Sequence, residues 1–336
     1  MKKVLYLVLT MLLLTGCGEK PVDNPNENQN NDSNKTPIAS KTEVEVVDLE
    51  SNSRPIAVMI NNHKSAQKAQ TGLNDAYLVY EFVVEGGITR MMALFKDADT
   101  AKIGTVRSSR HYYLDYALEN DAIYVHFGWS EIAEQDIPKL KIDNVNGLYD
   151  GCFWRENPLN IAYEHTVYTN MEKLNKTIKN KGYRTTSNSD LLLDYNILDA
   201  DLSKIDGSKK AANVKITYSD YQTNEFVYDE EAKVYHKYSN GELRKDLVSG
   251  EKFEVKNIIT YQVKNYTITD KLQQLNNIGK GNGYYISNGY AVPITWEKDS
   301  RSSKTVYKYL NGEEIKVNDG ITYIQVQPSG KNLEFN

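Results

Sequence analysis

Cysteine and positive charge are both scarce in this 336-residue chain, and each scarcity excludes a class of protein. The two cysteines, Cys17 and Cys152, are too few for a disulfide-rich scaffold. The 45 acidic residues outnumber the 40 lysines and arginines, which gives a net charge of −5. Nucleic-acid binders usually carry a basic stripe, so no nucleic-acid partner is expected. With 40% apolar and 25% charged residues, the composition also excludes a wholly disordered chain and a multi-span membrane protein.

The first 17 residues are organised like the leader of a bacterial lipoprotein. Lys2 and Lys3 precede an apolar run of about eleven residues, which is too short to span a bilayer stably. The lipobox-like Leu14-Thr15-Gly16-Cys17 follows, and its cysteine would be diacylated on sulfur and become the new N-terminus. Two acyl chains, at about 0.8 kcal/mol per buried CH₂, anchor a protein lastingly. We therefore expect an extracytoplasmic protein held on the membrane by diacylglycerol on Cys17. The alternative is a buried cysteine in an ordinary leader or membrane helix.

Residues 18–50 are predicted to be a disordered tether. Six asparagines fall within the sixteen residues PVDNPNENQNNDSNKT at positions 21–36. A segment with so few apolar side chains cannot offset the entropy cost of becoming ordered. About thirty residues of coil reach roughly 30 Å root mean square, which is enough to lift a folded domain off a lipid surface.

An α/β domain is predicted over residues 51–190. Apolar runs that are typical of strands occupy residues 54–61, 77–84, 88–95, 102–106 and 121–127. Gly86-Gly87 separates two of these runs and indicates a hairpin. Helices are expected over residues 111–118, 130–140 and 170–181, with Ser108 or Ser109 capping the first, Ser130 capping the second and Gly182 ending the third.

A β-rich domain is predicted over residues 191–336. Short alternating runs such as NVKITYS and ITYIQVQ are separated by the turn pairs Asn240-Gly241 and Asn311-Gly312. The chain has 25 tyrosines, and those of this half mostly alternate along the runs, which indicates half-buried sheet faces. The expected class is α+β: a layered α/β sandwich as the N-terminal domain, with the β-rich C-terminal domain packed on it.

Four arginines of the first domain could bind an anion. Arg107 and Arg110 bracket Ser108-Ser109 at the start of a predicted helix, where free backbone N–H groups and two guanidinium forks would meet. The candidate ligand-binding residues are Asn61, Arg90, Arg107, Ser108, Arg110 and Arg155. The alternative is that these arginines form structural ion pairs with Glu81, Glu85, Asp115 or Glu119.

The candidates for catalysis are Glu81, Glu85, His126 and His165. Glu81 and Glu85 lie four residues apart near the end of a predicted strand, so both could lie on one face, although solvated turn carboxylates are an alternative. A nucleophilic Cys152 would need a nearby base such as His165. No motif for a dinucleotide, a P-loop or a compact metal site is present, so no cofactor and no metal are expected. A metal centre would have to assemble His126, His165 and a carboxylate from separate elements.

The order of several motifs is similar to that of a known bacterial family. RPIAVMINNH, DAYLVYEFVVEGGITR, KIGTVRSSRHYYLDYALENDAIYVHFGWS and FWRENP resemble the YerB-like lipoproteins, a family defined as a domain of unknown function. Residues 54–185 resemble its N-terminal domain and residues 214–328 its C-terminal domain, with Tyr323 where the family often has tryptophan. The resemblance implies an extracytoplasmic lipoprotein with a layered α/β sandwich and supplies no reaction. The matching motif positions are Asn61, Glu81, Glu85, Arg90, Arg107, Ser108, Arg110, His126 and Arg155.

Three functions are compatible with these patterns. The first is a tethered binding or accessory lipoprotein of the cell envelope that recognises an anionic wall polymer, a glycan or an envelope protein through its arginines and tyrosines. The second is an envelope hydrolase or transferase that uses Glu81 or Glu85 with His126 and His165, which requires these side chains to converge around one polar pocket. The third is a passive structural lipoprotein.

Overall fold

The buried apolar runs of both halves of the chain come together in one mixed sheet. The structure is a computed structural model that describes residues 41–269 and 271–336, so the leader, Cys17 and residues 18–40 of the predicted tether lie outside the described residues. Residues 41–336 form one compact unit. The predicted tether is therefore too long at its end: Val47 is buried in the core, and the N–H groups of Glu45 and Val46 donate to the carboxylate of Asp319. The strands of the main sheet, in spatial order, are β10 (Lys209–Lys210), β20 (Tyr290–Lys298), β19 (Gly279–Ser287), β16 (Asn257–Val263), β23 (Thr322–Pro328), β2 (Leu78–Val83), β3 (Thr89–Phe95), β1 (Ile56–Asn61), β5 (Ile123–His126) and β6 (Asn144–Asn146), with β21 (Val306–Tyr309) paired to β20.

The second large sheet is antiparallel and comes wholly from the second half. Its strands are β14 (Glu242–Leu243), β13 (Val234–Ser239), β12 (Thr223–Asp229), β11 (Asn213–Thr217) and β24 (Leu333–Phe335), with β15 (Glu254–Val255) paired to β13. Three small sheets consist of β17 (Asn265–Thr267) with β18 (Gln273–Leu275), β9 (Asp194–Asn196) with β22 (Lys316–Asn318), and β4 (Ile103–Gly104) with β8 (Val167–Thr169) and β7 (Trp154–Arg155). The 3₁₀ turns are η1 (Lys64–Ala69), η2 (Leu73–Asp75), η3 (Glu85–Gly87), η4 (Tyr163–His165) and η5 (Leu202–Lys204).

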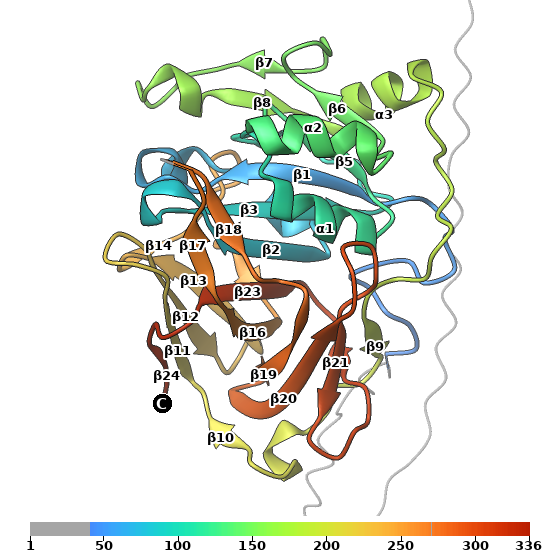
Figure 1. The fold of residues 1–336 in the computed structure, drawn as a ribbon. Helices are drawn as coiled ribbons and strands as arrows, with labels where there is room; N and C mark the ends of the chain where they lie inside the picture. Colours follow the sequence, from blue (N-terminus) through green and yellow to red (C-terminus); the bar gives the residue numbers. More distant parts are fainter. Residues whose placement is uncertain (1–40, 270) are drawn as a thin grey trace, which may run out of the picture. The chain divides into compact units, whose positions relative to one another are not determined.

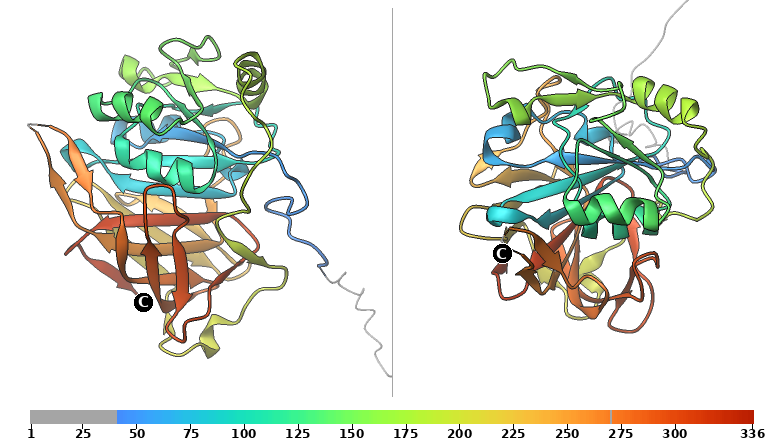
Figure 2. Two further views of the ribbon diagram at one scale, coloured as in Figure 1. Left: turned by 45° about the vertical axis from the view of Figure 1, so that its right-hand side comes forward. Right: turned by 45° about the horizontal axis from the view of Figure 1, so that its top comes forward.

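The described residues form three α-helices, all of them in the first half. They are α1 (His111–Glu119), α2 (Glu131–Lys139) and α3 (Met171–Asn180). Helices α1 and α2 contact each other and lie on one side of the strands β1, β2 and β3 (Figures 1 and 2). Ser130 caps α2 by accepting from the N–H of Ala133, as predicted, and Gly182 follows the end of α3 in the left-handed conformation that favours glycine.

The two faces of β2 show how the layers are held together. The even-numbered side chains contact α1, since Phe82 lies 4.5 Å from Tyr116 between ring centroids. The odd-numbered Glu81 points the other way, where its carboxylate meets the ammonium of Lys237 on β13 at 2.6 Å. A strand that is buried on both faces needs a nearly continuous apolar run, and LVYEFV has one apart from Glu81. The predicted α+β class is confirmed.

Strand β2 joins the two halves of the chain through its backbone. Leu78 of β2 pairs with Thr322 of β23, and the parallel ladder continues to Phe82 and Val326. The hairpin between β2 and β3 that Gly86-Gly87 predicted is present, with Leu78 opposite Leu94. The domain boundary between residues 190 and 191 stays a prediction, but strands from either side of it share the main sheet.

The tyrosines are core residues to a greater extent than predicted. Ten of the twelve largest fully buried side chains are tyrosines, and six of these lie before residue 211. The expectation that the excess mainly forms half-buried sheet faces of the second half was therefore wrong. In α1, the hydroxyl of Tyr112 donates to the carbonyl of Val83, and that of Tyr113 to the carbonyl of Arg90. Tyrosine can replace phenylalanine in this core because its hydroxyl finds a backbone acceptor.

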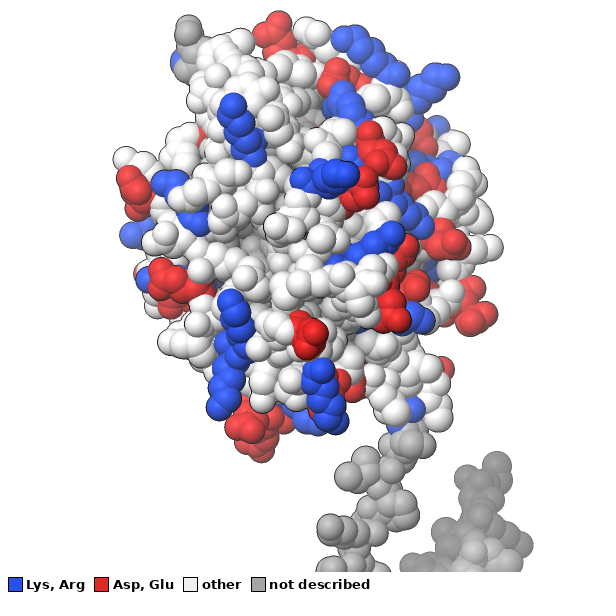
Figure 3. All heavy atoms as spheres, turned by 60° about the horizontal axis from the view of Figure 1, so that its bottom comes forward, with Lys and Arg blue, Asp and Glu red and all other residues white. Residues whose placement is uncertain are grey.

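The surface carries both charge signs in mixture. On the face in Figure 3, lysines and arginines are interspersed with aspartates and glutamates. A charged partner that binds this face therefore depends on local groups rather than on a broad field of one sign. Within residues 41–269 and 271–336, no helix has both the length and the apolar character needed to cross a membrane.

Candidate functional site

An open pocket of about 530 Å³ brings together three of the predicted ligand-binding residues, Arg107, Ser108 and Arg155. Arg155 lies on β7, which pairs with β8 and through it with β4, so this small sheet carries Arg155 to the segment that follows β4. The side chains of Phe127, Trp129 and Tyr163 add an aromatic wall. We call these six residues the arginine groove. Glu131, Glu134 and Glu164 line the same pocket, so its charge is mixed.

Arg107 and Arg155 are held in place by neutral acceptors. Arg107 donates through Nη1 to the carbonyl of Glu164 at 3.0 Å, and Arg155 donates through Nη1 to the carbonyl of Tyr163 at 2.5 Å. The guanidinium of Arg155 also lies 3.7 Å from the ring centroid of Tyr163. Partial burial lowers the pKa of Arg107 without neutralising it. Neither arginine forms an ion pair with any described residue, so both keep N–H donors that an anion could accept from.

A second pocket of about 470 Å³ continues from the arginine groove, because Trp129 and Glu134 line both. Its wall includes Asn146 and the exposed Tyr149, whose ring centroid is 5.9 Å from that of Trp129. The side-chain nitrogen of Asn146 is buried and has no hydrogen-bond partner in the described part of the chain. The second pocket is also lined by charged residues, among them Lys141, Asp150 and Lys181, so the two pockets together provide a long surface with charged groups of both signs.

Arg110 does not join Arg107, which corrects the predicted pair of forks at a helix N-terminus. Arg110 forms an ion pair with Glu85, with Nη2 at 2.7 Å and Nε at 2.8 Å from the same carboxylate oxygen. The pairing lowers the pKa of Glu85, although burial opposes it. For Arg110, the alternative that the sequence analysis kept open, a structural ion pair with Glu85, is therefore the one that the structure has. Arg90 is buried and donates to the carbonyl of Ser108 at 2.7 Å, so it does not line the groove itself but helps to hold Ser108 in position.

The serines before α1 are not caps, contrary to prediction. The N-cap residue is Arg110, which makes no side-chain capping bond. Ser109 is fully buried: its N–H donates to the carbonyl of Gly128, and its hydroxyl accepts from that of Tyr124 at 2.9 Å. Those contacts use the backbone N–H of Ser109, so this donor is not available to an anion.

Glu81 and Glu85 are engaged separately, so they do not act as a pair of carboxylates. Glu81 is fully buried and accepts hydrogen bonds from Asn62 at 2.9 Å and Thr89 at 2.7 Å besides its ion pair with Lys237. It does not line any of the five main pockets of the described residues. Glu85 lies in the turn after β2, and its carboxylate is paired with Arg110, which precedes α1.

The two histidines are also held by internal partners. The Nδ1 of His126 faces the carbonyl of Gly128 at 2.8 Å, and its Nε2 faces the amide oxygen of Asn144 at 3.2 Å. The Nδ1 of His165 accepts from the side chain of Asn61 at 2.8 Å, and its ring stacks on His63 at 4.8 Å. In the described ranges no three histidine, cysteine or carboxylate side chains gather as metal ligands. The convergence that the hydrolase or transferase hypothesis requires is not present.

Cys152 is placed as a packed thiol. Its exposed fraction is 4%, and burial raises its pKa, which disfavours the reactive thiolate. His165, the base considered for it, is bound to Asn61 instead. A nucleophilic Cys152 is therefore not supported.

The buried imidazole of His126 makes stability depend on pH. Burial lowers its pKa to about 4, against about 6.5 in an unfolded chain. Between these values the unfolded state binds the proton and the folded state does not, so stability is lost as the pH falls below about 6.5. At pH 5 the loss due to His126 is about 2 kcal/mol. We expect the free energy of unfolding in urea to fall less between pH 7.5 and pH 5 for His126→Gln than for the unchanged protein. An equal fall in both proteins would contradict this role of His126.

The sequence did not indicate the aromatic part of the groove. Helix α2 and strand β6 separate Trp129 from Tyr149 of the neighbouring pocket, and β7 separates Tyr149 from Tyr163. The exposed fractions of the two tyrosines, 74% and 72%, are high for aromatic side chains. Two local patterns in the sequence could have indicated loop positions for these aromatic residues. Trp129 directly follows Gly128, and Tyr163 follows a segment that contains Pro158.

Comparisons with known proteins place this chain beside a bacterial family. Residues 42–184 match the family described as "Protein of unknown function (DUF3048) N-terminal domain", and residues 214–324 match the corresponding C-terminal domain. The chain is 30% identical over 296 residues to "Putative lipoprotein YerB" of Bacillus subtilis (strain 168), covering 85% of this chain and 81% of that one. It is also similar to the crystal structure of the YerB protein from Bacillus subtilis, with a TM-score of 0.72 and 28% identity over 88% of this chain and 97% of the other. The resemblance found in the sequence is confirmed.

Proposed function

The chain belongs to the DUF3048 family, and from this premise we propose that it is a lipid-anchored extracytoplasmic protein that binds an anionic glycan of the cell envelope. The lipobox ending at Cys17 and the name of its Bacillus relative support the anchor. Two acyl chains on Cys17 would hold the chain at the membrane, and residues 18–40, which precede the compact unit, would act as the tether.

The observation that carries the binding proposal is the meeting of Arg107 and Arg155 in one open, aromatic-walled pocket, where neither forms a salt bridge with another described residue. Free guanidinium donors suit the phosphate or carboxylate groups of a polymer. The half-buried Trp129 lines both pockets and suits a sugar ring, whereas Tyr163 already has Arg155 stacked on it.

The acidic residues of the groove narrow the kind of polymer. Glu131, Glu134 and Glu164 would repel a chain with closely spaced negative charges. A glycan whose anionic groups are separated by neutral sugar units avoids this repulsion, because the carboxylates can then accept hydrogen bonds from sugar hydroxyls. The neighbouring pocket at Asn146 and Tyr149 provides room for further units.

Replacing Arg107 and Arg155 together with alanine tests the proposal. The full-length chain, purified in detergent, is sedimented with insoluble cell walls of Bacillus subtilis before and after acid extraction of their anionic polymers. Hydrogen bonds to charged groups contribute about 1.5–3 kcal/mol each, so we expect the double variant to bind at least tenfold more weakly. Extraction should abolish binding of the unchanged protein.

The matched control removes the same charge elsewhere. Lys209 and Lys210 are exposed on β10, which pairs only with β20 at an end of the main sheet. Lys209→Ala with Lys210→Ala should leave wall binding within about twofold, because surface charges away from a site contribute little. An equal loss in both double variants, or full retention by the arginine variant, would refute a specific site in the groove.

A further inference from the structure

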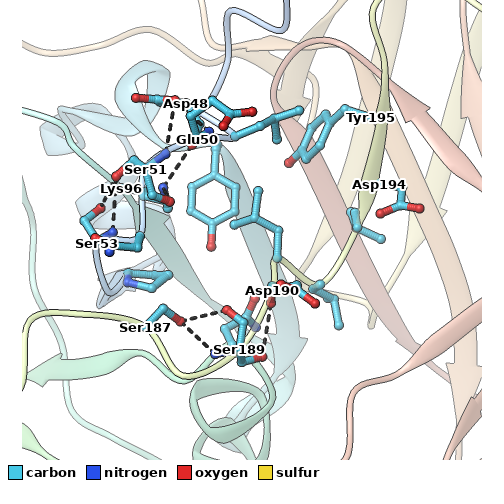
Figure 4. A pocket seen from close by; sticks show the side chains of 18 of the residues that line it. Asp48, Glu50, Ser51, Ser53, Lys96, Ser187, Ser189, Asp190, Asp194 and Tyr195 are labelled. Atoms are coloured by element: carbon cyan, nitrogen blue, oxygen red, sulfur yellow. Dashed lines mark hydrogen bonds between the residues drawn. The ribbon is translucent and has the colours of Figure 1, made fainter.

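A larger cavity, of about 870 Å³, lies apart from the arginine groove. It is open to solvent on one side and is lined by the segment before β1, by residues 187–195 and by Lys304 and Lys316 of the second half. Figure 4 shows Asp48 and Ser51 on one side, Ser187 and Ser189 on the opposite side, and Tyr195 closing a third side. No lining residue is shared with the groove, and the volume is within the range of roughly 300–1,000 Å³ of small-molecule sites.

Two buried polar groups that line this cavity have no partner among the described residues. The first is the hydroxyl of Tyr77, whose side chain is 3% exposed. Burial raises the pKa of Tyr77 far above its usual range, so the hydroxyl keeps its proton and remains a donor. An unsatisfied buried hydroxyl costs about 1–3 kcal/mol, which a ligand atom that accepts its hydrogen bond would offset.

The second unpartnered group is the amide oxygen of Asn120, which is 5% exposed. Its orientation is fixed by its neighbours. Tyr80 gives its only hydroxyl hydrogen to Glu119, so the Tyr80 oxygen must accept from the Asn120 nitrogen at 2.9 Å. The same nitrogen donates to the carbonyl of Tyr116 at 2.8 Å. The Asn120 oxygen is therefore left as an acceptor, which complements the donor of Tyr77.

The charged residues of the lining indicate a ligand without net charge. Four carboxylates and three lysines face the cavity: Asp48, Glu50, Asp190, Asp194, Lys96, Lys304 and Lys316. Lys96 is already bonded to the carbonyls of Asp48 and Ser51, and Lys304 to that of Leu191, so these two ammonium groups hold the walls together. An anion would be repelled by the four carboxylates, whereas a neutral molecule rich in hydroxyls can bond to carboxylates, serines and amides alike.

We propose that this cavity binds a neutral oligosaccharide of two or three sugar units. Sugar hydroxyls both donate and accept, as Asn120 and Tyr77 require, and the apolar faces of sugar rings can pack on Leu192 and Tyr195. The site is independent of the arginine groove, which is proposed for an anionic polymer. Its lining residues come from the first half of the chain, from residues 187–195 and from the second half.

Tyr77→Phe tests the proposal, because it removes only the unpartnered oxygen. Titration calorimetry of the full-length chain in detergent uses maltotriose and chitotriose as probes, one without and one with acetamido groups. We expect at least one probe to bind to the unchanged protein, and the variant to bind it about tenfold more weakly. Its melting temperature should stay equal or rise, since no protein hydrogen bond is lost.

Tyr235→Phe is the matched control. The Tyr235 hydroxyl donates to the carbonyl of Ala211 and accepts from the N–H of Gly289, and the residue does not line the cavity. This variant should melt at a lower temperature and bind the sugar normally. Failure of both sugars to bind, or equal affinity in Tyr77→Phe, overturns the proposal. Wall sedimentation through Arg107 and Arg155 should be unchanged in Tyr77→Phe, so the two proposals fail independently.

Discussion

Replacing Glu119 with leucine should lower the free energy of unfolding by about 3–5 kcal/mol, because it leaves the ammonium of Lys298 buried without a counter-charge. Both side chains of this ion pair have an exposed fraction of 0%, and the atoms that meet are 2.7 Å apart. The carboxylate at the end of α1 also accepts from the hydroxyl of Tyr80 and from the backbone and hydroxyl of Thr305. One side chain of the first half thus satisfies three residues, two of them from the second half.

A double variant separates the loss of the pair from the loss of the carboxylate's packing. Glu119→Leu with Lys298→Met removes both charges, and such apolar replacements of buried ion pairs are often close to neutral. We expect the double variant to recover a substantial part of the stability lost in the single variant, measured by urea unfolding. Glu172→Leu, on the exposed side of α3, should change stability by less than about 0.5 kcal/mol. A double variant as unstable as Glu119→Leu alone would show that the buried charge is not the cause.

The elements of this fold could be predicted from the sequence because they depend on neighbouring residues. Gly86-Gly87 marks the hairpin of β2 and β3, and Ser130 marks the start of α2, since turn geometry and capping are set within a few positions. The pairing of β2 with β23 is different. Leu78 and Thr322 are far apart in the sequence, and an apolar strand carries no label for its partner. The sheet that joins the two halves therefore could not be predicted.

The candidate site was predicted in part for the same reason. Arg107 and Arg110 were grouped because they are neighbours in the sequence, but the intervening residues turn their side chains to different partners. Arg155 joins Arg107 only through the pairing of β7, β8 and β4. Glu81 and Lys237 illustrate the limit most clearly: an acidic residue in a strand is normally a solvent-facing or functional group, and its buried partner lies 156 positions away.

That buried pair supports a further prediction, in which the two partners differ in their effect. Glu81→Leu leaves the ammonium of Lys237 with only the sulfur of Met91 at 3.5 Å and the ring of Tyr323 at 5.2 Å. We expect the free energy of unfolding to fall by about 3–5 kcal/mol, because neither contact replaces a carboxylate. Burial already lowers the pKa of Lys237, so without Glu81 the deprotonated amine becomes still more favoured in the folded state.

Lys237→Met should lower the free energy of unfolding by about 1–2 kcal/mol less than Glu81→Leu does. The reason is that the carboxylate of Glu81 keeps the hydrogen bonds from Asn62 and Thr89. Methionine fills the space of the lysine stem at the same depth. Chemical unfolding of both variants gives the comparison directly. If Lys237→Met were the more damaging, the hydrogen bonds of Glu81 would not compensate for the missing cation. In that case the main stabilisation of the buried Glu81 carboxylate would come from the ammonium of Lys237 and not from the hydrogen bonds that Asn62 and Thr89 donate.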